Sequence, residues 1–122
     1  MSYYYEVKIS AENQEQADKI LNSLLEKKLV TGGQFTKQPA RFLWKGKVQD
    51  MDYVTIATYT TDKHKSAVMD DVRKTSVEEV PMMTFTLPDD INEELRNWID
   101  ETLAWNFFYH PLVFNLTLAK SF

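Results

Sequence analysis

Apolar and polar residues alternate at the start of the chain. The odd positions from residue 3 to residue 9 are apolar or aromatic, whereas most even positions are polar. A period of two predicts a half-buried β-strand. The period then lengthens to that of an α-helix, with a stripe made of Ala17, Ile20, Leu21, Leu24, Leu25 and Leu29. The stripe predicts an amphipathic helix, which we expect Gly32-Gly33 to end.

Two β-rich runs, residues 35–44 and residues 53–61, flank a short polar tip. Lys45-Gly46 predicts a tight turn between them, because glycine adopts positive φ at no steric cost. Pro39 places the first run at a sheet edge or a bulge, since proline donates no backbone hydrogen bond. The two runs together predict an antiparallel hairpin.

The second half of the chain repeats the helix-and-strand pattern. A thinner apolar stripe over residues 62–75 predicts a second helix, and residues 82–87, bounded by two prolines, predict a fourth strand. Asp90 and Glu93 have the spacing of a capping box. They predict the start of a third helix, whose apolar stripe consists of Ile91, Leu95, Trp98, Ile99 and Leu103. Alternation over residues 112–119 predicts a final strand.

The predicted order is therefore β-α-β-β-α-β, followed by one more helix and one more strand. The first six elements predict an α+β fold, a ferredoxin-like βαββαβ sandwich whose antiparallel sheet carries two helices on one face. The chain has 122 residues and no repeats or linkers. We therefore expect a single domain over residues 1–122.

Composition removes several classes of function. The formal net charge of -4 gives no basic surface, so no nucleic-acid partner is expected. Cysteine is absent, which excludes disulfides, thiol nucleophiles and zinc–thiolate sites. No apolar run is long enough to span a bilayer, so no membrane partner is expected. The first residues lack the pattern of a signal peptide, and we expect a cytoplasmic protein.

Metal-ligating and catalytic patterns are also missing. The two histidines, His64 and His110, are far apart in sequence. We expect His64 to be exposed on a polar helix and His110 to lie in a turn. Met82 and Met83 alternate across a strand, which favours core packing over joint chelation. With no nucleophile or phosphate-loop motif either, we predict no catalytic residue, no transition-metal site and no cofactor.

Acidic pairs are plentiful and have different interpretations. The pair Asp89-Asp90 is explained by helix capping, and Asp70-Asp71 by a solvated helix face. Glu78-Glu79 is a third pair, and carboxylate oxygens are the ligands that a hard cation such as calcium or magnesium takes.

Four stretches of the chain resemble the CutA-type divalent-cation-tolerance family, in the same order as in that family. They are residues 24–30, residues 44–47, residues 59–61, and residues 79–81 with Trp98 further on. The resemblance implies a ferredoxin-like homotrimer that is not an enzyme and that holds a small ligand or cation in clefts between subunits.

The chain also departs from the family pattern. Gly32 or Gly33 stands where the family usually has a cysteine, and Ser76-Val77-Glu78 stands where it usually has His-Pro-Tyr. Tyr59 stands where it usually has a lysine. We therefore carry over the fold and not the copper ligands. The resemblance places Glu78-Glu79 where the family has its ligand-bearing loop, so we treat this pair as a candidate site for a hard cation such as calcium or magnesium.

Five residues are the resulting candidates for a ligand site or an interface: Trp44, Lys47, Tyr59, Glu78 and Glu79. The indole of Trp44 either reaches a neighbouring subunit or packs in its own core. The short family members have no counterpart of residues 104–122. This apolar C-terminal extension either covers a sheet edge of its own subunit or pairs with a neighbour.

Two other classes of function stay open at this point. A PII-like signalling trimer would bind an adenine nucleotide between subunits, although the chain lacks clustered arginine and glycine for it. A dimeric ferredoxin-like monooxygenase would suit the high aromatic content and the extra C-terminal strand.

Overall fold

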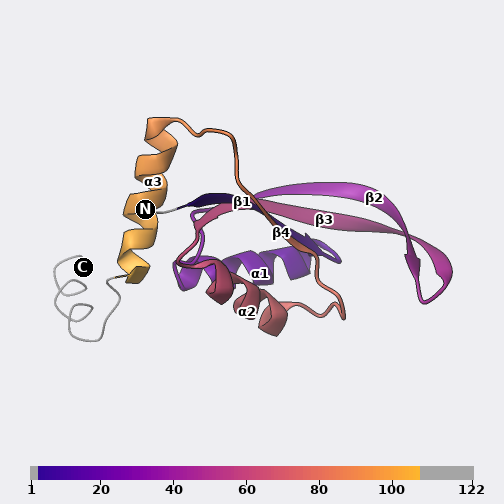
Figure 1. Cartoon of the computed structure of the whole chain (residues 1–122). Helices are drawn as coiled ribbons and strands as arrows, with labels where there is room; N and C mark the ends of the chain where they lie inside the picture. Colours follow the sequence, from indigo (N-terminus) through magenta and orange to yellow (C-terminus); the bar gives the residue numbers. More distant parts are fainter. Residues whose placement is uncertain (1–2, 108–122) are drawn as a thin grey trace.

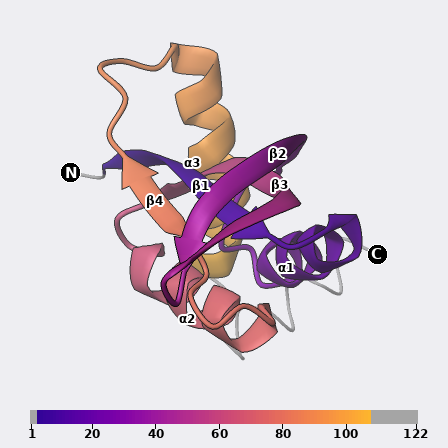
Figure 2. The ribbon, with the colours of Figure 1, turned by 90° about the vertical axis from the view of Figure 1, so that its right-hand side faces the viewer.

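The computed structural model describes residues 3–107, with side chains up to residue 103. A four-stranded antiparallel sheet has the strand order β2-β3-β1-β4. Helices α1 and α2 pack side by side on one face of this sheet (Figures 1 and 2). The elements are β1 (Tyr4–Ala11), α1 (Gln14–Glu26), β2 (Gln34–Trp44), β3 (Lys47–Thr61), α2 (Lys65–Thr75), β4 (Met83–Thr86) and α3 (Glu93–Phe107). The predicted ferredoxin-like α+β sandwich is confirmed.

The core forms between the sheet and the first two helices. Alternate residues of β1 and β3 point toward the helices, because successive side chains on a strand point to opposite faces of the sheet. The apolar stripe of α1 faces these residues, because residues three and four apart lie on the same side of a helix. The fully buried apolar residues of this core include Val7, Ile9, Ala17, Ile20, Leu24, Val54, Ile56, Val68 and Val72.

The predicted end of the first helix is wrong, because α1 ends at Glu26 rather than at Gly32-Gly33. Lys28 takes the left-handed conformation, with φ of 56°. The backbone N–H of Lys28 donates to the carbonyl of Leu25, and that of Leu29 donates to the carbonyl of Leu24, each at 3.0 Å. This is a Schellman motif, in which the buried side chains of Leu24 and Leu29 supply the usual apolar contact.

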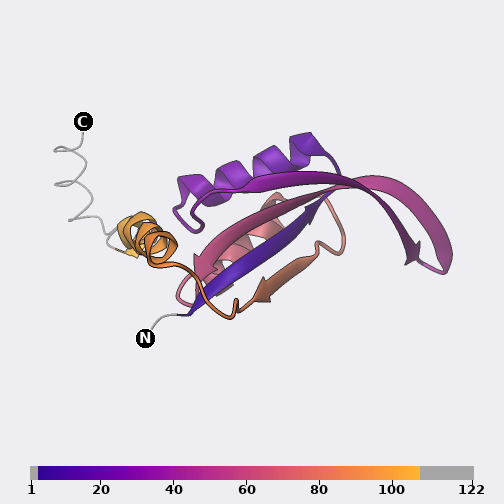
Figure 3. The same cartoon turned by 90° about the horizontal axis from the view of Figure 1, so that it is seen from above.

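The predicted hairpin is confirmed and is longer than expected. Strand β3 begins at Lys47 rather than near residue 53, and Trp44 pairs with Lys47 beside a two-residue turn. Lys45 and Gly46 both have positive φ, 49° and 81°, as a type I′ turn requires. The tip of the hairpin projects beyond the helices (Figures 1 and 3).

Two polar residues of α2 and its entry are buried, contrary to the predictions. His64 is 7% exposed, and its Nδ1 lies 2.9 Å from the hydroxyl of Thr61. Asp71 is 5% exposed and forms an ion pair with Lys27 of α1. Each was expected on a solvated face because its own helix is polar. Each makes its side-chain contact instead with a residue from outside that helix.

Helix α3 lies at the end of the sheet near the start of β1 (Figure 3). The predicted capping box is wrong, since α3 begins at Glu93 and Asp90 accepts from the backbone N–H of Ile91 instead. Ile99 and Leu103 are buried as predicted, whereas Trp98 is 47% exposed.

Two further predictions concern the ends of β4 and of the chain. Met82, predicted to be in the core, is 62% exposed, while Met83 packs against the core. The helix continues to Phe107, so the predicted C-terminal extension begins as part of α3. His110 and the predicted strand at residues 112–119 lie outside the described residues.

Candidate functional site

A cavity of about 370 Å³ lies where the loop between α2 and β4 meets the β2–β3 hairpin. Its walls come from the end of β1, both strands of the hairpin and the loop. The lining residues are Glu12, Phe42, Trp44, Gln49, Met51, Tyr53, Val77, Glu78, Glu79 and Val80. We call this space the hairpin cavity. It combines three aromatic rings with three carboxylates, and the lining includes no lysine, arginine or histidine.

Glu78 is the half-buried acid of the hairpin cavity. The hydroxyl of Ser10 donates to its carboxylate at 3.1 Å, and the hydroxyl of Tyr53 also donates to it. Burial raises the pKa of Glu78 above its ordinary value, and the two hydroxyl donors oppose that shift by stabilising the charged form. Glu12 adds a weaker repulsion that raises the pKa further. The carboxylate is therefore partly desolvated, and the two groups that stabilise its charged form are neutral hydroxyls.

Ser10 fixes the position of this acid. Its backbone N–H donates to the carbonyl of Met82 at 3.0 Å, and its side-chain oxygen accepts from the N–H of Met82 at 3.0 Å. The N–H of Glu78 donates to the hydroxyl of Ser76 at 3.1 Å. The loop that carries Glu78 is thus attached to the end of β1 by several hydrogen bonds, and the carboxylate is held toward the hairpin.

The outer part of the hairpin cavity is more exposed. Lys45 Nζ lies 3.7 Å from a carboxylate oxygen of Glu79 and 5.4 Å from the ring centroid of Trp44. Both side chains of the ion pair are about two-thirds exposed or more, so the pair itself adds little to stability. Phe42 and Tyr53 pack edge to face, with centroids 5.7 Å apart.

Three of the five candidate residues, Trp44, Glu78 and Glu79, line this one cavity. Lys47 pairs with Trp44 across the turn but does not line the cavity, and Tyr59 lies further along β3, opposite Glu6. Sequence reasoning missed Ser10, Tyr53 and Glu12. Only the alternation of β3 marked Tyr53 as facing one side, and no local signal linked Ser10 to Glu78, because 68 positions separate them.

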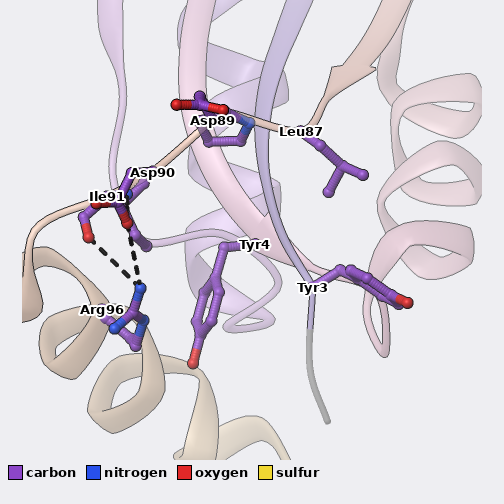
Figure 4. A pocket seen from close by; sticks show the side chains of 8 residues that line it. Tyr3, Tyr4, Leu87, Asp89, Asp90, Ile91 and Arg96 are labelled. Atoms are coloured by element: carbon purple, nitrogen blue, oxygen red, sulfur yellow. Dashed lines mark hydrogen bonds and ion pairs between the residues drawn. The ribbon is translucent and has the colours of Figure 1, made fainter.

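A larger cavity, of about 620 Å³, lies between β1 and the entry to α3 (Figure 4). Arg96 extends into it, 3.7 Å from Asp90 and with its guanidinium 5.7 Å from the ring centroid of Tyr4. The hydroxyl of Tyr4 donates to Asp100 at 2.8 Å, and burial followed by this contact raises the pKa of Tyr4. The charged groups here pair with one another across the joint between α3 and the sheet, so we assign them to holding α3.

A divalent cation needs several ligands placed close together. Within the described residues, no group of three or more His, Cys, Asp or Glu side chains is placed to hold a metal ion. Calcium takes six to eight oxygen ligands, and Glu79 already pairs with Lys45. Residues 3–103 of a single chain therefore do not form a divalent-cation site by themselves. No helix in the described part of the chain has the length and apolarity needed to cross a membrane.

The fold and the cavity define a small ferredoxin-like protein with a cavity between an extended hairpin and the loop that joins α2 to β4. A profile of the CutA1 divalent ion tolerance protein family matches residues 6–102. This chain therefore belongs to the CutA1 family. The match favours the CutA-like interpretation over the PII-like and monooxygenase alternatives.

Individual relatives agree with this assignment. A divalent-cation tolerance protein CutA from Thermotoga maritima is 29% identical over 92 residues, which cover 75% of this chain and 90% of the relative. The structure described as the periplasmic divalent cation tolerance protein CutA from Archaeoglobus fulgidus is 26% identical. It matches with a TM-score of 0.79 over 82% of this chain and 98% of that one. CutA1 from Oryza sativa, 18% identical with a TM-score of 0.78 over 82% of this chain and 93% of that one, shares the fold.

Proposed function

We propose that this protein is a non-enzymatic CutA1-family member that assembles as a homotrimer and binds a small ligand or ion in the hairpin cavity. One observation carries the ligand-binding part. Trp44, Glu78 and Tyr53 come from separate segments and converge on one cavity, where Glu78 is partly desolvated. An acid whose pKa is raised by burial in a concave, partly apolar space is typical of binding sites.

The absence of a catalytic arrangement supports the non-enzymatic part. The sequence has no cysteine. Within the described residues the only histidine is buried against Thr61, so it is not available to a substrate in the hairpin cavity. The relatives are named for divalent-cation tolerance rather than for a reaction.

The hairpin supports the assembly. Leu43 and Val48 are 73% and 65% exposed, and they pair with each other across the projecting end of the hairpin. Apolar side chains on a projecting two-stranded ribbon are costly in water and favour cover by another copy. Strands β2 and β4 are also the open edges of the sheet. Cover of this hairpin by a neighbour would place residues of that neighbour beside the hairpin cavity.

A cytoplasmic location fits the lack of cysteine, and cell fractionation tests it.

A thermal-stability screen tests the ligand-binding function. Wild-type protein and Glu78→Gln are heated in the presence of divalent cations and of small organic cations, anions and neutral molecules. Any compound that binds the folded state raises the melting temperature by mass action. We expect at least one compound to stabilise the wild type and to lose that effect in Glu78→Gln, while Glu26→Gln, an exposed change at the end of α1, keeps it. No stabilising compound, or only compounds indifferent to Glu78, would contradict the proposal.

A further inference from the structure

The geometry points to an organic cation as the ligand of the hairpin cavity: a primary ammonium carried on a short apolar body. This inference rests on the proposed function, because it names the chemical class that the same cavity would bind.

The walls of the hairpin cavity match the two halves of such a ligand. The rings of Phe42, Trp44 and Tyr53 and the side chain of Met51 supply apolar surface. Glu12, Glu78 and Glu79 supply negative charge, and no cationic side chain belongs to the lining. An anionic ligand would meet three carboxylates, with only Lys45 at the rim as a counter-charge. A cation with an apolar body would gain attraction from both the carboxylates and the faces of the rings.

An ammonium group of the protein already makes these contacts. Lys45 Nζ stands between Trp44 and Glu79, 5.4 Å from the ring centroid and 3.7 Å from the carboxylate oxygen. The Lys45 side chain is 71% exposed, so it is free to turn into solvent at small cost. We therefore treat Lys45 as an internal occupant of the rim, which a ligand ammonium would displace or which would compete with it.

The inner part of the cavity also favours a positive charge. Glu78 is partly desolvated and is stabilised by hydroxyl donors of Ser10 and Tyr53, not by a cation. An ammonium placed beside it would supply the missing counter-charge and has three N–H donors for carboxylates and hydroxyls. A hard metal ion would need more oxygen ligands than this chain places together. An organic cation needs fewer, because the aromatic faces contribute.

Isothermal titration calorimetry with three ligands of one shape tests the inference. The full chain, in its native assembly, is titrated with n-hexylammonium, n-hexanol and hexanoate. We expect n-hexylammonium to bind about tenfold more tightly than n-hexanol, because cation–π and carboxylate contacts together exceed about 1.4 kcal/mol. Hexanoate should not bind. Raising the salt concentration should weaken only the binding of n-hexylammonium.

Variants separate this inference from a simple loss of structure. Glu78→Gln and Trp44→Leu should each weaken n-hexylammonium binding by about tenfold. Lys45→Met removes the internal ammonium and keeps the length of the side chain, so it should strengthen binding, by about two- to fivefold. Lys37→Met, an exposed change elsewhere on β2, should leave it unchanged. A gain of affinity in Lys45→Met cannot come from unfolding.

Three results would overturn the inference, and they differ in what they mean for the proposed function. If n-hexanol binds as tightly as n-hexylammonium and both lose affinity in Trp44→Leu, the hairpin cavity binds ligands but does not select cations. If n-hexylammonium does not bind and a compound from the thermal screen still depends on Glu78, only the ligand class is wrong. If neither assay finds a ligand that depends on Glu78, the ligand-binding function itself fails.

Discussion

Two buried threonines of β3 provide a paired test of how polar groups stabilise this fold. Thr60 is fully buried, and its hydroxyl donates to the carbonyl of Leu29 at 2.7 Å. Thr58 is 3% exposed, and its hydroxyl has no hydrogen-bond partner within the described residues. Thr→Val keeps the shape of each side chain and replaces the hydroxyl by a methyl group. The same change should therefore have opposite effects at two positions of one strand.

The expected magnitudes follow from these contacts. Thr60→Val removes a donor from a buried carbonyl, and such a loss costs about 1–3 kcal/mol of the free energy of unfolding. Thr58→Val removes a buried hydroxyl that gains nothing from hydrogen bonding, and should raise the free energy of unfolding by about 1 kcal/mol. The two variants should therefore differ by about 2–4 kcal/mol. The sign at Thr58 is the sharper part of the prediction.

Urea unfolding followed by far-ultraviolet circular dichroism measures both effects. The wild type and the two variants are compared at one protein concentration, because assembly makes the apparent stability depend on it. The slope with urea should be the same in all three, so that the midpoints report stability alone. Equal shifts of the midpoint in the same direction for Thr58→Val and Thr60→Val would refute the reasoning. The hydrogen bond of Thr60 would then make no difference to the free energy of unfolding.

Three further predictions concern other parts of the fold. Lys27→Met removes the partner of the buried Asp71 and should lower the free energy of unfolding by about 1–3 kcal/mol, measured by urea. Burial lowers the pKa of His64, whose ring contacts Thr61. The wild type should therefore lose stability as the pH falls below the ordinary histidine pKa of 6.5, whereas His64→Gln should show a flatter pH profile between pH 7.5 and 5.5. Ile99→Ala should cost about 2–4 kcal/mol and leave a cavity under α3; a cost near zero would mean that α3 is not anchored there.

The order of the elements was predictable because each depends on a local pattern. The stripe of α1, the alternation of β1 and the Lys45-Gly46 turn each act over a few residues, and the structure contains all three. The end of α1 was not predictable from its glycines. Lys28 ends the helix through hydrogen bonds and the contact between Leu24 and Leu29, which the composition of the segment does not reveal.

The candidate site was predictable only in part, for the same reason. Glu78 became a candidate because the resemblance places it in the family's ligand-bearing loop, and Trp44 because it stands beside the Lys-Gly-Lys tip of the predicted hairpin. Their common cavity depends on how the loop packs against β1 and the hairpin. The burial of Asp71 likewise depends on Lys27, 44 positions away. Contacts of this range are set by the tertiary fold, and a single sequence carries no signal for them.

The most direct test of the proposed homotrimer is native mass spectrometry on protein purified without added metal. One spectrum reports the number of subunits and the mass of any retained ligand. The proposed function predicts a dominant species of three chains, and an excess mass that disappears in Glu78→Gln would identify the ligand directly. A monomer or a dimer as the dominant species, at the concentrations where the protein is folded, would contradict the assembly on which the proposed site depends.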